Sequence, residues 1–120
     1  MVGRRKAVNP GFRLMILKSV PKEARRASFW KRVIAEAEVS RRNRRVVNLY
    51  KLNRLTKEGD VVYVPGKVLG TGEIDHPITI SAFAFTRKAY EKLLKAGSTI
   101  LTTGEFAERY PRGGGVKIIG

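Results

Sequence analysis

Residues 78–97, ITISAFAFTRKAYEKLLKAG, carry the clearest structural signals in this chain. Residues 78–86 are rich in β-branched and aromatic side chains and are apolar on both alternating faces, which predicts a central strand. Thr86 is a good helix cap and Gly97 is typical of a helix end, so residues 87–96 are predicted to form a helix. The residues predicted to face inward from this helix are Ala89, Tyr90, Leu93 and Leu94.

Shorter elements are predicted on both sides of this stretch. Residues 61–64, 98–101 and 113–119 have the composition of strands. Thr102 and Glu105 have capping-box spacing, which predicts a short helix ending before Pro111. Val46 and Val47 are expected to start a short strand, and leucines at positions 49, 52 and 55 predict a helical turn after it. The polar residues that this turn is expected to leave exposed are Asn48, Lys51, Asn53 and Arg54.

The N-terminal part of the chain has helical signals. Asn9 and Pro10 suit a helix start, and Pro21 suits its end. Ser28, which follows a polar segment, is a candidate cap for a second helix. Trp30 in that helix is interpreted as a core anchor rather than a base-stacking platform, because the residues three and four positions after it are also apolar.

The order of these elements predicts an α+β fold in a chain of 120 residues. A basic helical segment, residues 1–57, is expected to precede a compact α+β core, residues 58–120, and the two are expected to form one domain. There are no cysteines, which excludes disulfides and thiolate sites. The longest apolar run near the N-terminus covers only residues 14–17, so we expect no export signal, no membrane span and a cytoplasmic protein.

The charge of the chain is large and unevenly distributed. The formal net charge is +15, and residues 1–57 hold 17 Lys and Arg against 3 acidic residues. Residues 58–120 hold 8 against 7 and are nearly neutral. Because self-repulsion of this size opposes a compact isolated state, we expect a polyanion to neutralise the first half of the chain.

The stretch PGKVLGTGEIDHP, residues 65–77, is rich in glycine and follows a predicted strand, as phosphate-binding loops do. In a P-loop, a Gly-Lys pair is followed by Ser or Thr, and another glycine stands five positions before the glycine of that pair. Here Val68 follows Gly66-Lys67, and Val61 stands five positions before Gly66. A dinucleotide fingerprint starting at Gly70 would need glycine or alanine where Asp75 stands, and would open a helix rather than a strand. Both motifs fail, and the stretch is interpreted as a turn between two strands.

No catalytic or metal-binding constellation is predicted. His76 is the only histidine in the chain, and between Asp75 and Pro77 it is interpreted as a turn residue with local hydrogen bonds. The carboxylate pairs lie on different helix faces, beside a turn glycine or on a solvated helix surface. We therefore predict no enzyme, no cofactor, no metal and no small-molecule substrate.

Arginines are concentrated in SRRNRRVVNLYKLNR, residues 40–54. Guanidinium groups pair bidentately with phosphates and stack on exposed bases, and asparagines can read base edges or 2′-hydroxyls. Arg112 stands beside three glycines that permit close backbone approach. This pattern favours binding to nucleic acid.

Residues 67–97 carry a family resemblance. They read K-V-L-G-T-G-E-I, a spacer, I-T-I, and then F-T-x-x-A-x-x-x-L-x-x-x-G. This resembles the signature region of bacterial large-subunit ribosomal protein fifteen and of its archaeal and eukaryotic relative, large-subunit ribosomal protein eighteen of the "e" type. Residues 41–80 are similar to the eighteen-e branch nearly throughout, and the short length is similar to its archaeal members.

The resemblance implies a compact domain of irregular β-β-α turns in the large ribosomal subunit. It implies structural binding to large-subunit ribosomal RNA and to neighbouring ribosomal proteins. The glycines of residues 65–77 would let Lys67 approach RNA or permit tight turns.

Two hypotheses compete with this one: a free-standing RNA-binding or RNA-chaperone protein, and a phosphate-handling enzyme. The residues predicted to bind RNA are Arg4, Arg5, Lys6, Arg13, Arg25, Arg26, Arg41, Arg42, Asn43, Arg44, Arg45, Asn48, Lys51, Asn53, Arg54, Lys67 and Arg112.

Overall fold

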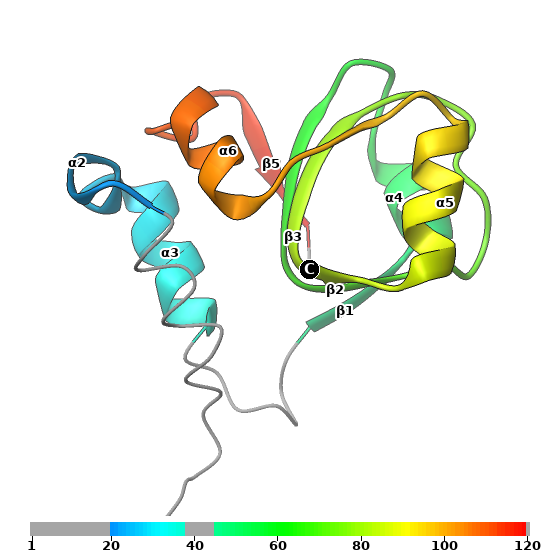
Figure 1. Cartoon of the computed structure of the whole chain (residues 1–120), viewed down its shortest axis with the longest axis horizontal. Coiled ribbons are helices and arrows are strands. Elements are labelled where there is room, and N and C mark those ends of the chain that lie inside the picture. Colours follow the sequence, from blue (N-terminus) through cyan, green and yellow to red (C-terminus); the bar gives the residue numbers. More distant parts are fainter. Residues whose placement is uncertain (1–19, 38–44, 120) are drawn as a thin grey trace, which may run out of the picture. The chain divides into compact units, whose positions relative to one another are not determined.

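The computed structural model describes residues 20–37 and 45–119 (Figure 1). It divides into two compact units, which are described separately. The helical unit consists of residues 20–37 and 103–114, and the sheet unit consists of residues 45–102 and 115–119. The helix expected after Pro10 lies outside the described residues. The described elements combine helices with a β-sheet, which confirms the α+β class.

Within residues 45–119, five strands form one sheet, and every pairing in it is parallel. The order is β1-β2-β3-β4, and β5 pairs with the first part of β2. Strand β3 has neighbours on both sides, which confirms its predicted central position. The strands are β1 (Arg45–Asn48), β2 (Val61–Leu69), β3 (Thr79–Phe85), β4 (Thr99–Ile100) and β5 (Val116–Ile118).

Helices α4 (Leu49–Leu55) and α5 (Arg87–Lys95) cover one face of this sheet (Figure 1). Leu52 from α4 and Leu93 from α5 are fully buried in the same cluster as Val62, Val64 and Ile80 from the strands. Burying side chains of this size contributes about 1.5–3 kcal/mol each, so this cluster is the main source of stability in the sheet unit.

The capping signals of α5 are confirmed. The Thr86 hydroxyl accepts a hydrogen bond from Ala89 N at 3.2 Å, and Gly97 ends the helix with φ +85°. The predicted inward face of α5 is only half right. Ala89 and Leu93 are buried, whereas Tyr90 and Leu94 are 44% and 51% exposed. The helix lies flat on one face of the sheet, so only a narrow stripe of its surface is covered.

Strand β2 is longer than its predicted bounds. It continues to Leu69, so the loop to β3 begins at Gly70 and not at Pro65. The register between β2 and β3 shifts between Val64 and Lys67. Pro65 lies at this irregularity, where its missing N–H costs no regular ladder bond. The irregularity therefore allows the strand to continue past Pro65, beyond the predicted residues 61–64.

The helical unit is built on aromatic packing. Its described helices are α2 (Lys22–Arg25), α3 (Ser28–Ala37) and α6 (Thr103–Arg109). Trp30 is fully buried, which confirms it as a core anchor, and its ring lies edge-on to Phe106 at 6.2 Å between centroids. Trp30 Nε1 also donates to the Tyr110 carbonyl at 3.1 Å. This pairing joins α3 to α6.

Two details at the start of α3 differ from the sequence-based expectation. Residues 22–25, expected as part of a polar connection, form the short helix α2. The first hydrogen bond of α3 runs from Lys31 N to the Ala27 carbonyl, so Ser28 lies within the first turn and is not its cap. The short turn between α2 and α3 leaves no extended residue at Ser28, and extended backbone is what a capping side chain needs.

Candidate nucleic-acid interface

Strand β1 places Val46, which follows the arginine run of residues 41–45, beside Lys67. The Cα partners in the β1–β2 ladder are Arg45 with Gly66 and Val46 with Lys67. Val46 is 54% exposed and Lys67 is also exposed, whereas the next pair, Val47 and Val68, is fully buried. Lys67 therefore stands at the surface where the arginine-rich segment enters the sheet.

The predicted RNA-binding set extends beyond the described residues. The side chain of Arg45 is not described, although its backbone opens β1. The predicted residues that lie outside the described residues are Arg4, Arg5, Lys6, Arg13, Arg41, Arg42, Asn43 and Arg44.

Two predicted arginines come together in the helical unit. Arg26 and Arg112 line the same open depression of about 400 Å³, with Glu23 and Ala27 completing its wall. Both arginines are exposed. Their neighbour Arg25 is half-buried, and its Nε has no hydrogen-bond partner among the described residues. This depression therefore concentrates positive charge on the helical unit.

The turn that carries Arg112 is held by contacts of the next residue, Gly113, with Tyr110 and Phe29. Gly113 N donates to the Tyr110 carbonyl at 3.1 Å, and Gly113 has φ +70°. A Cβ atom at Gly113 would collide with the ring of Phe29. The close approach that Gly113 permits is thus to the protein's own core, whereas Gly114 and Gly115 face open space.

The predicted polar face of α4 is less exposed than expected. Arg54 is exposed, but Lys51 and Asn53 are half-buried. The Asn53 Oδ1 accepts a hydrogen bond from Asp75 N at 3.1 Å, so this oxygen holds the loop between β2 and β3. Asn48 is also half-buried, and its Oδ1 has no partner among the described residues. Arg54 is therefore the predicted residue of α4 best placed to meet a polyanion.

The loop between β2 and β3 is wedged between α4 and α5. A Cβ atom at Gly70 would lie 2.8 Å from Lys88 Cβ and 2.9 Å from Ala89 N, and one at Gly72 would lie 2.6 Å from Tyr50 Cβ. Gly72 also has φ +90°. The glycines thus permit close packing of backbone on two helices, and the interpretation as a turn holds for residues 70–77, while residues 65–69 belong to β2.

Lys92 fixes this loop, a role that the sequence did not reveal. Its Nζ donates to the carbonyls of Gly70 and Gly72 at 3.0 and 2.7 Å and pairs with the Glu73 carboxylate at 2.7 Å. The hydrogen bond and charge of Lys92, with weaker contributions from neighbouring lysines, lower the pKa of Glu73 below 4.5. The ion pair therefore stabilises the fold at pH values above the ordinary pKa of a glutamate. This stabilisation is lost as the pH falls through the lowered pKa of Glu73.

Replacing Lys92 with methionine is expected to destabilise the protein by about 1–2 kcal/mol, because two loop carbonyls lose a charged donor that is only partly replaced by water. Urea unfolding at neutral pH followed by circular dichroism measures this change. Lys95, exposed at the end of the same helix, provides the matched control, and Lys95→Met should leave the midpoint nearly unchanged. Equal midpoints for the two variants would show that the loop does not depend on Lys92.

His76 makes one local hydrogen bond, as expected of a turn residue, and one to a residue twenty positions away. Its Nδ1 is 3.0 Å from Asp75 Oδ1, and its Nε2 is 2.7 Å from Thr56 Oγ1. The Thr56 hydroxyl donates to the Leu52 carbonyl at 2.6 Å and is buried. This proton is committed to the backbone at the end of α4, so the arrangement holds the turn and does not activate a nucleophile.

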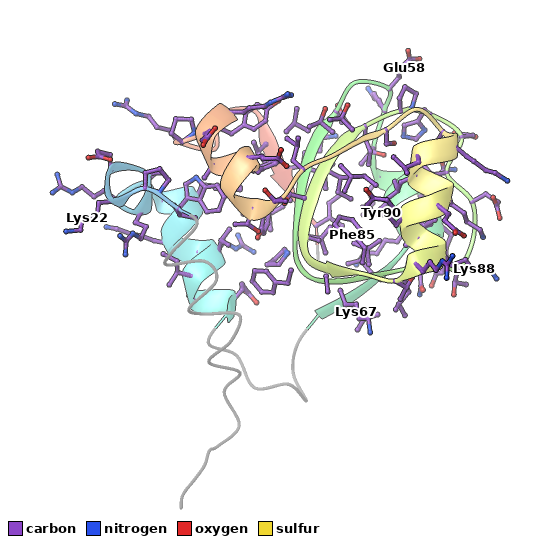
Figure 2. All side chains as sticks on the ribbon, in the orientation of Figure 1. Lys22, Glu58, Lys67, Phe85, Lys88 and Tyr90 are labelled. Atoms are coloured by element: carbon purple, nitrogen blue, oxygen red, sulfur yellow. The ribbon has the colours of Figure 1, made fainter. Side chains whose placement is uncertain are left out.

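Two more cations of the sheet unit have acidic partners. Lys117 Nζ lies 2.8 Å from Asp60 Oδ2, and this hydrogen bond, followed by one from Lys57 N, lowers the pKa of Asp60. Arg87 pairs with Glu91 at 3.3 Å. Within the part of the chain that the structure describes, Lys67 and Lys88 form no ion pair, as is also true of Lys51, Arg54, Lys57 and Lys95. Figure 2 shows Lys67 and Lys88 at the same end of the sheet unit, with Glu58 at the opposite end.

None of the helices in residues 20–37 and 45–119 has the length and apolar content needed to span a bilayer. The same residues contain no group of three or more His, Asp or Glu side chains that could hold a metal ion. Exposed, unpaired cations on a fold whose polar turns bond internally are typical of structural proteins that bind nucleic acid.

The comparison with known proteins identifies the family. Residues 6–120 match the family described as ribosomal protein 60S L18 and 50S L18e. The large ribosomal subunit protein eL18 of Pyrobaculum aerophilum is 48% identical over 97 residues, which cover 80% of this chain and 79% of that protein. The proteins of the same name from Sulfolobus acidocaldarius and Methanothermobacter thermautotrophicus are 45% and 42% identical, covering 62% and 78% of this chain and 64% and 77% of their own length. The chain belongs to this family, and the archaeal-type resemblance is confirmed.

Proposed function

We propose that this protein, a structural constituent of the large ribosomal subunit, binds large-subunit ribosomal RNA chiefly through its basic first half. Its family is one of structural ribosomal proteins and not of enzymes. Residues 1–57 hold a net charge of +14. Phosphate neutralisation with counterion release makes such a segment bind RNA strongly and in a salt-dependent manner.

The pairing of Val46 with Lys67 is the structural observation that carries this proposal. In this proposal Lys67 adds a charge on the sheet unit next to the point where the arginine run, residues 41–45, ends. Because β1 is hydrogen-bonded into the sheet, the backbone at the end of the run is held in place and loses less entropy on binding than a free tail. In this proposal the arginine run and Lys67 contact adjacent RNA phosphates, and Arg26 with Arg112 forms a second basic contact on the helical unit.

We also propose that the two halves of the chain act as one domain. Strand β1 and α4 belong to residues 1–57 but pack into the sheet unit, whose other strands and helix come from the second half. Helix α6 belongs to residues 58–120 but packs against α3 through Trp30 and Phe106. Each unit thus draws on both halves, which favours a single folding unit over separable modules.

As a large-subunit protein it works in the cytoplasm, within the ribosome, beside ribosomal RNA and neighbouring ribosomal proteins. The alternative of a free-standing RNA-binding or chaperone protein rests on the same charge but is not favoured by the family. The phosphate-handling enzyme has lost its main support, because the glycine loop packs on α4 and α5.

Sedimentation of a cell extract through a sucrose gradient at moderate salt tests the proposed function. We expect the protein in the large-subunit and intact-ribosome fractions, detected by an antibody or a tag. When magnesium is lowered to separate the subunits, it should follow the large subunit and not the small one. Recovery at the top of the gradient, or only in light RNA-containing fractions, would contradict the ribosomal assignment and support the free-standing alternative.

A further inference from the structure

The glycine loop brings the first turns of α4 and α5 to one place on the sheet unit. Gly72 packs on the backbone of Tyr50 in α4, and Gly70 packs on Lys88 in α5. Thr71, between the glycines, has an exposed side chain, and its carbonyl accepts a hydrogen bond from Tyr50 N at 3.2 Å. Three consecutive residues span at most about 7 Å between their outer Cα atoms. Tyr50 and Lys88 therefore flank a very short bridge.

The Tyr50 ring is exposed although its backbone is fixed. Tyr50 is 52% exposed, whereas Tyr63 and Phe83 in the same unit are 0% and 7% exposed. A single exposed aromatic residue is common on soluble proteins. Here, however, the backbone is held by the Thr71 carbonyl and by the contact with Gly72, so the ring offers a flat surface at little entropic cost.

Lys88 is not positioned to stabilise its helix. It lies in the first turn of α5, where the helix dipole disfavours a cation, and no acidic residue accompanies it there. The Glu73 carboxylate on the neighbouring loop is matched by Lys92 at 2.7 Å. Arg87, beside Lys88, has a side chain that is 93% exposed and forms an ion pair with Glu91, one turn further along the helix. Lys88 forms no ion pair of its own among the described residues and contributes only weakly to lowering the pKa of Glu73, so its charge is left largely to solvent at the end of the sheet unit that also carries Lys67 (Figure 2).

We propose that Tyr50 and Lys88 form an additional RNA contact, separate from the arginine run, that takes a short unpaired stretch of ribosomal RNA. A base stacks on the Tyr50 ring, and a neighbouring phosphate binds the Lys88 ammonium across the exposed Thr71. Stacking on an aromatic ring combined with a nearby cation is the usual way in which proteins hold single-stranded RNA. This inference rests on the proposed function and adds residues that the arginine pattern did not indicate.

Binding to protein-free large-subunit ribosomal RNA, measured by filter binding over a range of salt, tests this contact. Tyr50→Leu should weaken binding roughly tenfold, because it keeps the apolar bulk but loses the stacking surface, and Tyr50→Phe should bind like the wild type. Lys88→Gln should lower the slope of log K against log salt by about 0.7–0.9, the contribution of one phosphate.

The matched controls lie on α5. Tyr90→Leu removes an aromatic ring of similar exposure from another face of the helix, and Lys95→Gln removes an exposed cation from its other end. Both should bind like the wild type. Thermal melts by circular dichroism show whether each variant is folded, and Lys88→Gln keeps the test valid if Tyr50→Leu is unstable.

If the wild type binds but Tyr50→Leu and Lys88→Gln match it in affinity and salt slope, this contact does not exist and the proposed function stands. If these variants bind RNA normally but fail to enter large subunits, the surface docks a neighbouring protein, which also overturns the RNA contact. Failure of the wild type to bind large-subunit RNA would instead overturn the proposed function itself.

Discussion

Replacing Gly72 with alanine is expected to destabilise the protein by about 3 kcal/mol, from a strained backbone plus overpacking against a neighbouring element. Gly72 has φ +90°, and a Cβ atom there would lie 2.8 Å from Tyr50 N. Because the clash is with backbone, it cannot be relieved by a rotamer change, and the first turn of α4 must move. For a domain of ordinary stability, about 5–15 kcal/mol, this is a large loss.

Two other glycines separate the causes of this loss. Gly59 has φ +84° but open space around it, so Gly59→Ala measures the backbone strain alone. Gly70 packs against Lys88 and Ala89 without a positive φ, so Gly70→Ala measures the overpacking alone. Urea unfolding of the three variants should show Gly72→Ala as the least stable. If Gly72→Ala and Gly59→Ala lose the same stability, the loop is not wedged against α4.

The elements with complete local signals were predicted well from the sequence. Thr86 and Gly97 bound α5 because cap and stop residues act through the nearest few backbone groups. Trp30 was placed in the core because the apolar stripe of α3 is itself local. The central position of β3 followed from its two apolar faces, which need cover on both sides.

Features that depend on distant partners were not predictable in the same way. Pro65 ends a strand pattern by local rules, but the irregularity between β2 and β3 accommodates it. Tyr90 continues an apolar pattern, yet the flat contact of α5 with the sheet leaves it outside. Lys92 lies in the last turn of α5, where any cation suits the helix dipole, but its bonds to Gly70 and Gly72 depend on a loop about twenty residues away.

The candidate interface shows the same division. The concentration of charge in residues 1–57 is a property of composition and can be read without a structure. The meeting of Arg26 with Arg112 depends on helix packing, and the position of Lys67 beside Val46 depends on strand pairing. Asn53 illustrates the opposite case, since its type suggested base recognition but its Oδ1 holds Asp75 N.

Changing Arg41, Arg42, Arg44 and Arg45 together to alanine is expected to have the largest effect on RNA binding. If each arginine neutralises one phosphate, the slope of log K against log salt falls by roughly three, since each phosphate contributes about 0.7–0.9. A slope change of this size corresponds to an affinity loss on the order of a thousandfold at 0.1 M salt, if the two proteins bind equally near 1 M. The quadruple change to lysine keeps the charge and serves as the control.

The salt dependence of binding to large-subunit ribosomal RNA tests the central claim most directly. The wild type and the quadruple lysine variant should give similarly steep slopes, and the quadruple alanine variant should give a slope lower by roughly three. The claim that the arginine run fastens this protein to ribosomal RNA would be contradicted by an alanine variant whose slope equals that of the wild type.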